Sequence, residues 1–158
     1  MDWLQQLFTN PFLITGVTSW FVAQVLKTII HIFIYKKLDL KRLIGDGGMP
    51  SGHSATVTSM AAMIAFVYGA GSVEFAISAI LAVIVCHDAT GVRRETEKQA
   101  YLLNGLVKAF SELYEDDDDL IPEVKLKQFV GHTPVQVMAG ILLGCLNACL
   151  MYFLFYLL

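Results

Sequence analysis

Long apolar runs are the dominant feature of this sequence, and they restrict the chain to a membrane fold. The first run covers residues 11–35, in which only Gln24, Lys27 and His31 are strongly polar. About 20 apolar residues suffice to cross the core of a bilayer. Because 56% of the chain is hydrophobic and only 16% is charged, the chain is too apolar for an ordinary soluble domain. We therefore expect an integral membrane protein.

Turns and polar stretches divide the apolar runs into four predicted spans. Gly69-Ala70-Gly71-Ser72 predicts a tight reversal between the second run and the third. Before the fourth run, apolar residues at positions i, i+3 and i+7 from Glu95 to Tyr114 predict an amphipathic helix, which lies along the membrane surface or covers the polar end of the protein. We expect an all-α fold that forms a single membrane domain over residues 1–158. The spans are predicted at about 11–35, 51–69, 73–90 and 134–158.

Lysine and arginine residues predict the orientation of these four spans. Ten of the eleven basic residues lie in segments 36–50 and 91–133, and the remaining one, Lys27, lies in the first span. Loops rich in Lys and Arg are retained in the cytoplasm. We therefore expect a multi-pass protein of the cell membrane with these two segments in the cytoplasm and both termini outside. The acidic run Glu115–Asp119 is predicted to be a solvated loop.

Charge and cysteine spacing exclude several other classes of protein. A formal net charge of −3 excludes a strongly basic nucleic-acid binder. Cys86, Cys145 and Cys149 all lie in apolar stretches without the neighbours that a zinc site needs. Neither a disulfide framework nor a metal site is expected. Residues 1–6 lack a basic region before an apolar core, so we expect no removable signal peptide.

Three polar clusters lie on the predicted cytoplasmic face, at residues 47–54, 87–94 and 131–134. The first and third share one design, a turn containing Gly, Ser or Thr, and Pro that opens a helix and carries a histidine. Helix N-termini present free N–H groups and the positive end of a dipole, so both turns should attract an anion. Pro50 and Pro134 occupy positions suited to a first helical turn.

A phosphoryl group is the expected ligand, because basic side chains gather near these helix ends and match a phosphate. They are Arg93, Arg94, Lys98, Lys125 and Lys127. Lys27 can reach the same face from the first span or extend to lipid headgroups. Two histidines on opposite sides of a phosphate, His53 and His132, can divide the chemistry, one attacking phosphorus and the other protonating the leaving oxygen. This scheme requires no metal or other cofactor.

The three clusters together resemble the type 2 phosphatidic acid phosphatase and vanadium haloperoxidase superfamily. Pro50-Ser51-Gly52-His53 is similar to its central motif, and Gly131-His132-Thr133-Pro134 through Gly140 is similar to its C-terminal motif. Together with Asp88-Ala89-Thr90-Gly91-Val92-Arg93-Arg94-Glu95, they resemble the small, divergent, four-span branch of that superfamily. The resemblance covers most of the chain.

The resemblance implies a phosphohistidine mechanism with His132 as the nucleophile and His53 as the general acid. Ser51, Gly52 and the basic residues would hold the phosphate oxygens. Where the superfamily usually has an aspartate, four residues after the nucleophile, this chain has Gln136. Gln136 can accept a hydrogen bond from the imidazole, but it cannot stabilise an imidazolium as a carboxylate does. Asp88 is the predicted substitute, either as an orienting residue or as a partner of Arg93 or Arg94, which would replace the missing Ser-Arg pair of the superfamily.

The expected function is hydrolysis of a phosphomonoester or diphosphate of a lipid, of the phosphatidic acid or polyprenyl type, that enters laterally from the membrane lipids. One alternative is a binder or transporter of phosphorylated lipids without hydrolytic activity, and another is an assembly protein that binds no anion here. Gly140-x-x-x-Gly144-x-x-x-Ala148 places small residues along one face of the fourth span, where they pack spans within the chain or build an oligomer. We favour a homodimer, because four spans form a thin shell around a lipid-sized site.

Overall fold

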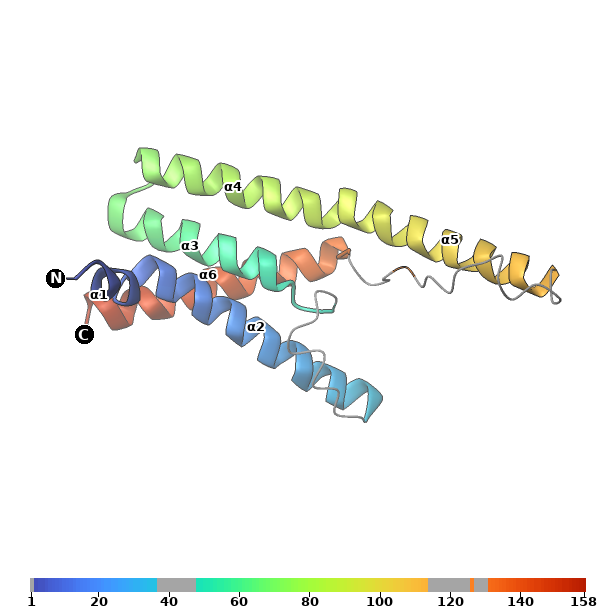
Figure 1. Ribbon diagram of the computed structural model, residues 1–158. Coiled ribbons are helices and arrows are strands. Elements are labelled where there is room, and N and C mark those ends of the chain that lie inside the picture. Colours follow the sequence, from blue (N-terminus) through green and yellow to red (C-terminus); the bar gives the residue numbers. More distant parts are fainter. Residues whose placement is uncertain (1, 37–47, 114–125, 127–130) are drawn as a thin grey trace.

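The computed structural model of the chain describes residues 2–36, 48–113, 126 and 131–158, and every regular element within them is a helix (Figure 1). This confirms the all-α prediction for the described part of the chain. The predicted acidic loop Glu115–Asp119, Lys125 and Lys127 lie outside the described residues, as do residues 37–47 of the first polar segment. The helices are α1 (Trp3–Phe8), α2 (Pro11–Tyr35), α3 (Gly52–Tyr68), α4 (Val73–Thr90), α5 (Val92–Leu113) and α6 (Pro134–Tyr156).

The start of α2 shows how local sequence sets the helix bounds. The side chain of Asn10 accepts hydrogen bonds from the backbone N–H groups of Phe12 and Leu13, at 2.9 and 3.2 Å, and Pro11 is the first helical residue. α2 therefore has the bounds predicted for the first apolar run. The six-residue α1 was not predicted, because so short a helix carries too little periodicity to be recognised.

The central helix α3 contacts α2, α4 and α6, and its closest neighbour is α6 (Figure 1). A methyl group at Gly140 would lie 2.5 Å from the carbonyl oxygen of Ser51, and one at Gly144 would lie 2.6 Å from that of Ala55. Both glycines are therefore required for the approach of the two backbones. The stripe of small residues on α6 is used to pack helices within the chain, which is one of the two roles expected for it.

Buried polar side chains join α2, α3 and α6 by hydrogen bonds between helices. Ser19 donates to the carbonyl oxygen of Ala55 at 3.1 Å, and Asn147 donates to that of Thr15 at 3.1 Å. Hydrogen bonds between helices satisfy polar groups that neither lipid nor an apolar core can satisfy. These three helices therefore form a tightly packed unit that holds the N-termini of α3 and α6 together.

Among the described residues, three helical stretches are long and apolar enough to cross a membrane: Pro11–Tyr35, Val73–Phe110 and Pro134–Tyr156. Four were expected from the sequence. The remaining one, α3, has 17 residues. At about 1.5 Å per residue this corresponds to roughly 25 Å, which is less than the hydrocarbon core of about 30 Å.

The amphipathic helix α5 does not fold over the polar end of the bundle, which was one of the two positions expected for it. It continues the direction of α4 and projects beyond the other helices (Figure 1). Hydrogen bonding continues through the junction, because the N–H of Gly91 donates to the carbonyl oxygen of His87 at 2.8 Å and that of Glu95 donates to Gly91 at 3.0 Å. A single glycine between the two helices is therefore too short a break to reverse the chain.

Candidate functional site

The three polar clusters meet at one end of the bundle, as the sequence predicted, and backbone hydrogen bonds connect them. The N–H of Ser51 donates to the carbonyl oxygen of Gln136, and the N–H of His132 donates to that of Ala89, both at 3.0 Å. A methyl group at Gly131 would lie 2.5 Å from the Cα of Arg94. Only glycine therefore allows the segment before α6 to lie directly against the start of α5.

The first cluster forms the N-terminus of α3. Ser51 is the N-cap, and its completely buried hydroxyl accepts hydrogen bonds from the N–H of Ser54 at 3.4 Å and from the Ser54 hydroxyl at 3.0 Å. Gly52 is the first helical residue, and a methyl group there would lie 3.4 Å from the indole of Trp20. Pro50 precedes the cap and lies two residues before the first helical residue, so the prediction that it lies in the first helical turn was wrong.

The third cluster forms the N-terminus of α6 and contains a capping box. The Thr133 hydroxyl accepts from the N–H of Gln136 at 3.4 Å, while the side-chain oxygen of Gln136 accepts from the N–H of Thr133 at 2.9 Å. Pro134 is the first residue of α6, as predicted. His132 lies just before this cap, and only 2% of its surface is exposed.

Gln136 also orients the imidazole ring of His132. Its side-chain oxygen lies 3.2 Å from Nδ1 of His132. Because the same oxygen accepts the backbone N–H of Thr133, the amide must turn its oxygen toward the ring, and Nδ1 must therefore carry the hydrogen. In a neutral imidazole Nε2 then carries the lone pair. This Nε2 atom is buried and has no hydrogen-bond partner among the residues that the structure describes.

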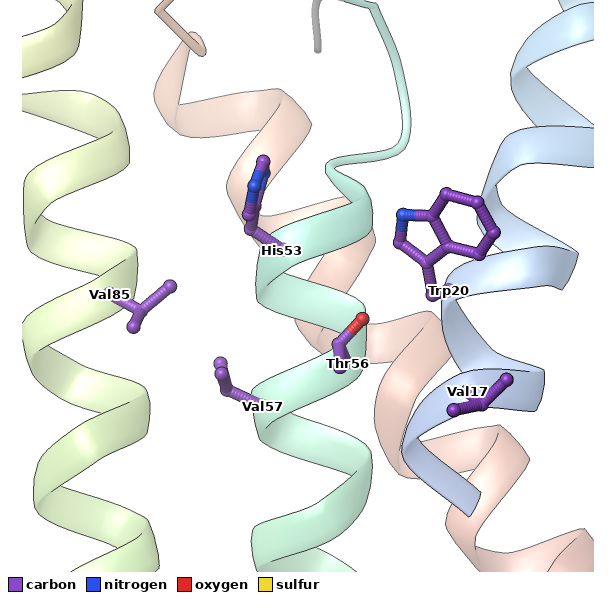
Figure 2. A pocket seen from close by; sticks show the side chains of 6 residues that line it. All are labelled: Val17, Trp20, His53, Thr56, Val57 and Val85. Carbon is purple, nitrogen blue, oxygen red and sulfur yellow. The ribbon is translucent and has the colours of Figure 1, made fainter. Parts of the chain in front are cut away.

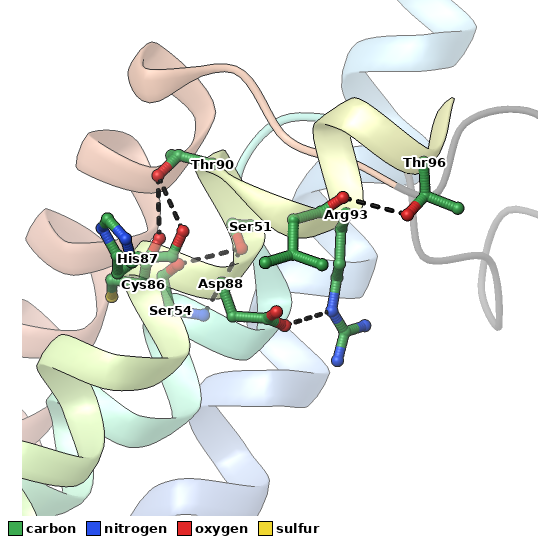
Figure 3. A network of polar contacts seen from close by, with 9 residues as sticks. Ser51, Ser54, Cys86, His87, Asp88, Thr90, Arg93 and Thr96 are labelled. Atoms are coloured by element: carbon green, nitrogen blue, oxygen red, sulfur yellow. Dashed lines mark hydrogen bonds and ion pairs between the residues drawn. The ribbon is translucent and has the colours of Figure 1, made fainter. Parts of the chain in front are cut away.

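Asp88, one of the predicted catalytic residues, is bonded to Arg93. The Nε of Arg93 donates to a carboxylate oxygen of Asp88 at 2.7 Å, across the junction between α4 and α5 (Figure 3). Both side chains are partly exposed, by 41% for Arg93 and 39% for Asp88. Of the two roles expected for Asp88, the structure supports that of arginine partner, because Gln136 holds the imidazole of His132.

Positive groups surround His132 from three helices. The ring centroids of His53 and His132 are 6.4 Å apart. Lys27, which is 3% exposed, extends from α2 across Gly48, where a methyl group would lie 3.0 Å from the Lys27 side chain. Burial is the main factor that lowers the pKa of His132 below its ordinary value, and the charges of Lys27, His53 and Arg93 lower it further, while the bond to Gln136 opposes them. His132 is therefore neutral at neutral pH.

The remaining predicted phosphate ligands are placed differently. Arg94 contacts the site through its backbone, against Gly131. Lys98 forms an ion pair with Glu95 at 2.6 Å on the surface of α5, where both side chains are about 60% exposed, at 58% and 61%. Such exposed pairs hold their side chains weakly. Within the described ranges, no three His, Cys, Asp or Glu side chains are grouped as metal ligands.

An apolar groove of about 330 Å³ begins beside His53 (Figure 2). Its floor is one face of α3, and α2 and α4 form its walls. Val17 on the α2 wall is 64% exposed, so the groove opens on the outer surface of the bundle. The sequence did not predict the groove, because its walls come from three separate apolar runs and no local spacing marks them. The lining residues are Val17, Trp20, His53, Thr56, Val57 and Val85.

Comparisons with known proteins agree with the resemblance seen in the motifs. The model of a family described as the divergent PAP2 family matches residues 8–147. A membrane protein of Bacillus subtilis (strain 168), described as uncharacterized and called YuiD, is 38% identical over 156 residues, which cover 95% of this chain and 99% of YuiD. No solved structure matches the chain.

Proposed function

Because the chain belongs to the divergent PAP2 family, we propose that it is an integral membrane phosphatase that hydrolyses a phosphomonoester or diphosphate of a lipid. The reaction proceeds through a phosphohistidine intermediate on His132. The three long apolar helices and the membrane protein relative support a location in the membrane. We infer the chemistry from the polar residues that meet at one end of the bundle.

The observation that carries the proposal is the state of the His132 ring. Its Nδ1 is engaged with Gln136, and its Nε2 is buried without a partner among the described residues. A buried nitrogen with a lone pair and no hydrogen bond is costly in a structural role. It is the arrangement that a nucleophile requires, because no proton has to be removed before attack.

The proposed reaction has two steps. In the first, the lone pair on Nε2 of His132 attacks phosphorus, the P–N bond forms, and the bond from phosphorus to the lipid oxygen breaks while His53 donates a proton to that oxygen. In the second, His53 takes a proton from water, the water oxygen attacks phosphorus, and the P–N bond breaks. Inorganic phosphate leaves, and both histidines return to their initial states.

Positive groups would hold the phosphate oxygens throughout. Lys27 and Arg93 contribute charge at His132, and the N-terminus of α3 at Gly52 contributes free N–H groups and the positive end of a dipole. Ser51 retains a hydroxyl hydrogen to donate while its oxygen caps the helix. Arg94 and Lys98 would act on the incoming headgroup from α5.

We propose α3 as a fourth span, because the turn at residues 69–72 returns the chain so that α3 and α4 lie side by side (Figure 1). Its shortness is compatible with a position in the centre of the bundle, where neighbouring helices rather than lipid surround it. The basic segments 36–50 and 91–133 would then lie in the cytoplasm. The substrate would enter laterally with its headgroup at that surface.

The test is phosphate release by the detergent-purified protein from phosphatidic acid, prenyl phosphate and prenyl diphosphate, in the presence of a chelator. His132→Ala is the control variant. We expect release by the wild type and none above background by the variant. Release that survives in His132→Ala would refute the mechanism. Tight binding of these lipids without any release would instead favour the binder or transporter. Gln136 would then be the first residue to substitute, because it stands where the superfamily usually has an aspartate.

A further inference from the structure

We propose that the groove beside His53 binds the hydrocarbon chain of the substrate and admits only one chain, so that the preferred substrates are single-chain lipid phosphates. Prenyl phosphates and lysophosphatidic acid belong to this class, whereas phosphatidic acid, with two acyl chains, does not. This inference rests on the proposed function and names the substrate class of that same site.

The groove is continuous with the reaction site through one residue. His53 lines the groove, and its ring lies 6.4 Å from that of His132, measured between centroids. Figure 2 shows His53 at one end of the groove, with Val57 and Val85 further along it. A lipid whose phosphorus lies at Nε2 of His132, and whose leaving oxygen takes a proton from His53, would therefore have the start of its chain at the mouth of the groove.

The lining matches an uncharged chain. Apart from His53, it consists of three valines, Trp20 and Thr56. The hydroxyl of Thr56 already donates to the carbonyl oxygen of Gly52 at 2.8 Å, so it offers no unsatisfied hydrogen to the groove. Among the described residues that line the groove, His53 alone has an ionisable side chain, and the charges of Lys27 and Arg93 act on the neighbouring His132. The complementary ligand is therefore an amphiphile with an anionic head and a single apolar tail.

The small volume of the groove and its single-turn floor fit one chain rather than two. Its floor is a single turn of α3, from His53 to Val57, and α2 and α4 rise on either side of it (Figure 2). The volume of about 330 Å³ is near the lower limit of small-molecule sites, which is roughly 300–1,000 Å³. In a two-chain glycerolipid both chains begin on neighbouring carbons next to the phosphate. The second chain would have to lie outside the groove, on the outer surface of the bundle.

The groove should govern selectivity more than overall affinity. Lipid tails are as apolar as the valines of the lining, so moving a chain from bilayer to groove yields packing contacts and little hydrophobic free energy. Filling the groove should therefore change kcat/KM for lipid substrates and leave the chemistry on a small substrate intact.

The experiment compares kcat/KM for lysophosphatidic acid, phosphatidic acid with the same acyl chain, and para-nitrophenyl phosphate, which has no chain. The variants are Val57→Phe, which narrows the groove, and Val83→Phe, a control at a position that is 65% exposed and outside the lining. For the wild type we expect lysophosphatidic acid to exceed phosphatidic acid by about ten-fold or more. Val57→Phe should lower the value for lysophosphatidic acid by about ten-fold and leave para-nitrophenyl phosphate within about two-fold.

The outcomes separate this inference from the proposed function. Equal rates on the one-chain and two-chain lipids, or an equal loss on para-nitrophenyl phosphate in Val57→Phe, would overturn the groove proposal while the phosphatase stands.

Absence of phosphate release from all three substrates would overturn the phosphatase. In that case the groove is tested by quenching of tryptophan fluorescence with a lysophosphatidic acid brominated on its chain. Quenching lost in Trp20→Phe supports the groove, and quenching unchanged in that variant overturns it.

Discussion

The N-termini of α3 and α6 follow the same local design and yet place their histidines in different surroundings. Each helix is capped by a hydroxyl that accepts a hydrogen bond from the N–H of the residue three positions later. The Ser51 hydroxyl accepts from Ser54, and the Thr133 hydroxyl accepts from Gln136. His53 follows its cap, lies in the first turn of α3 and lines the groove. His132 precedes its cap and is 2% exposed.

This difference of position relative to the cap suggests why one imidazole suits attack and the other suits proton transfer. A histidine before the cap can be held through Nδ1 by the capping-box glutamine and kept neutral by burial. A histidine after the cap stands at the groove, where a leaving lipid would pass. Two copies of one turn can therefore supply two chemical roles through a shift of a few residues.

The largest expected effects come from removing each histidine in turn. His132→Ala should abolish turnover and also the phosphoenzyme, because the proposed mechanism forms the P–N bond on Nε2 of His132. His53→Ala should slow turnover by about 10²–10⁴-fold, the usual contribution of a general acid, and still form some phosphoenzyme. Rapid acid-free quenching with a ³²P-labelled lipid phosphate measures both quantities. Loss of the labelled intermediate in His53→Ala but not in His132→Ala would reverse the assigned roles.

Gly131→Ala should show how much turnover depends on the position of His132, because it shifts the backbone and leaves the imidazole ring itself unchanged. A methyl group at this position would lie 2.5 Å from the Cα of Arg94, so the backbone before α6 must shift. Misplacement of a reacting group by about 1 Å can reduce turnover by about 10²-fold, and we expect a loss of kcat of that order. Gly71→Ala is the matched control, because a methyl group at Gly71 meets nothing within 4 Å. Full activity in Gly131→Ala would show that the close approach of the segment to α5 is not required.

Much of the fold and part of the site could be predicted from the sequence, and the failures have physical causes. The apolar run 11–35 gave the bounds of α2, because Asn10 and Pro11 are strong local signals for a helix start. The convergence of His53 and His132 also followed from motifs that each open a helix. The direction of α5 could not be predicted, because it depends on hydrogen bonds that continue through Gly91. The bond of Asp88 to Arg93 was one of two expectations that only the folded geometry could separate.

Gln136→Glu tests the electrostatic side of the comparison through pH dependence. Turnover requires neutral His132, so it is lost as the pH falls through the pKa of His132, which burial holds below its ordinary value. A carboxylate bonded to Nδ1 favours the imidazolium and therefore raises that pKa. The acid limb of the kcat/KM profile should therefore move to higher pH in Gln136→Glu. In Gln136→Ala turnover should fall without such a rise, and an unmoved limb in the Glu variant would argue against His132 as the titrating group.

The smallest expected effects distinguish a cap that serves the site from one that serves only its helix. Thr133 caps α6 and Ser72 caps α4 at the opposite end of the bundle, where its hydroxyl accepts the N–H of Phe75 at 3.2 Å. Thr133→Ala and Ser72→Ala should each reduce the free energy of unfolding by about 1 kcal/mol, measured by thermal unfolding in detergent. Only Thr133→Ala should also lower kcat, by a few-fold, because the loosened capping box no longer holds Gln136 against Nδ1 of His132. Thr133→Ser keeps the hydroxyl and should restore kcat. Equal kcat in both alanine variants would mean that Gln136 holds His132 without the cap, and that the two helix N-termini differ only in where their histidines lie.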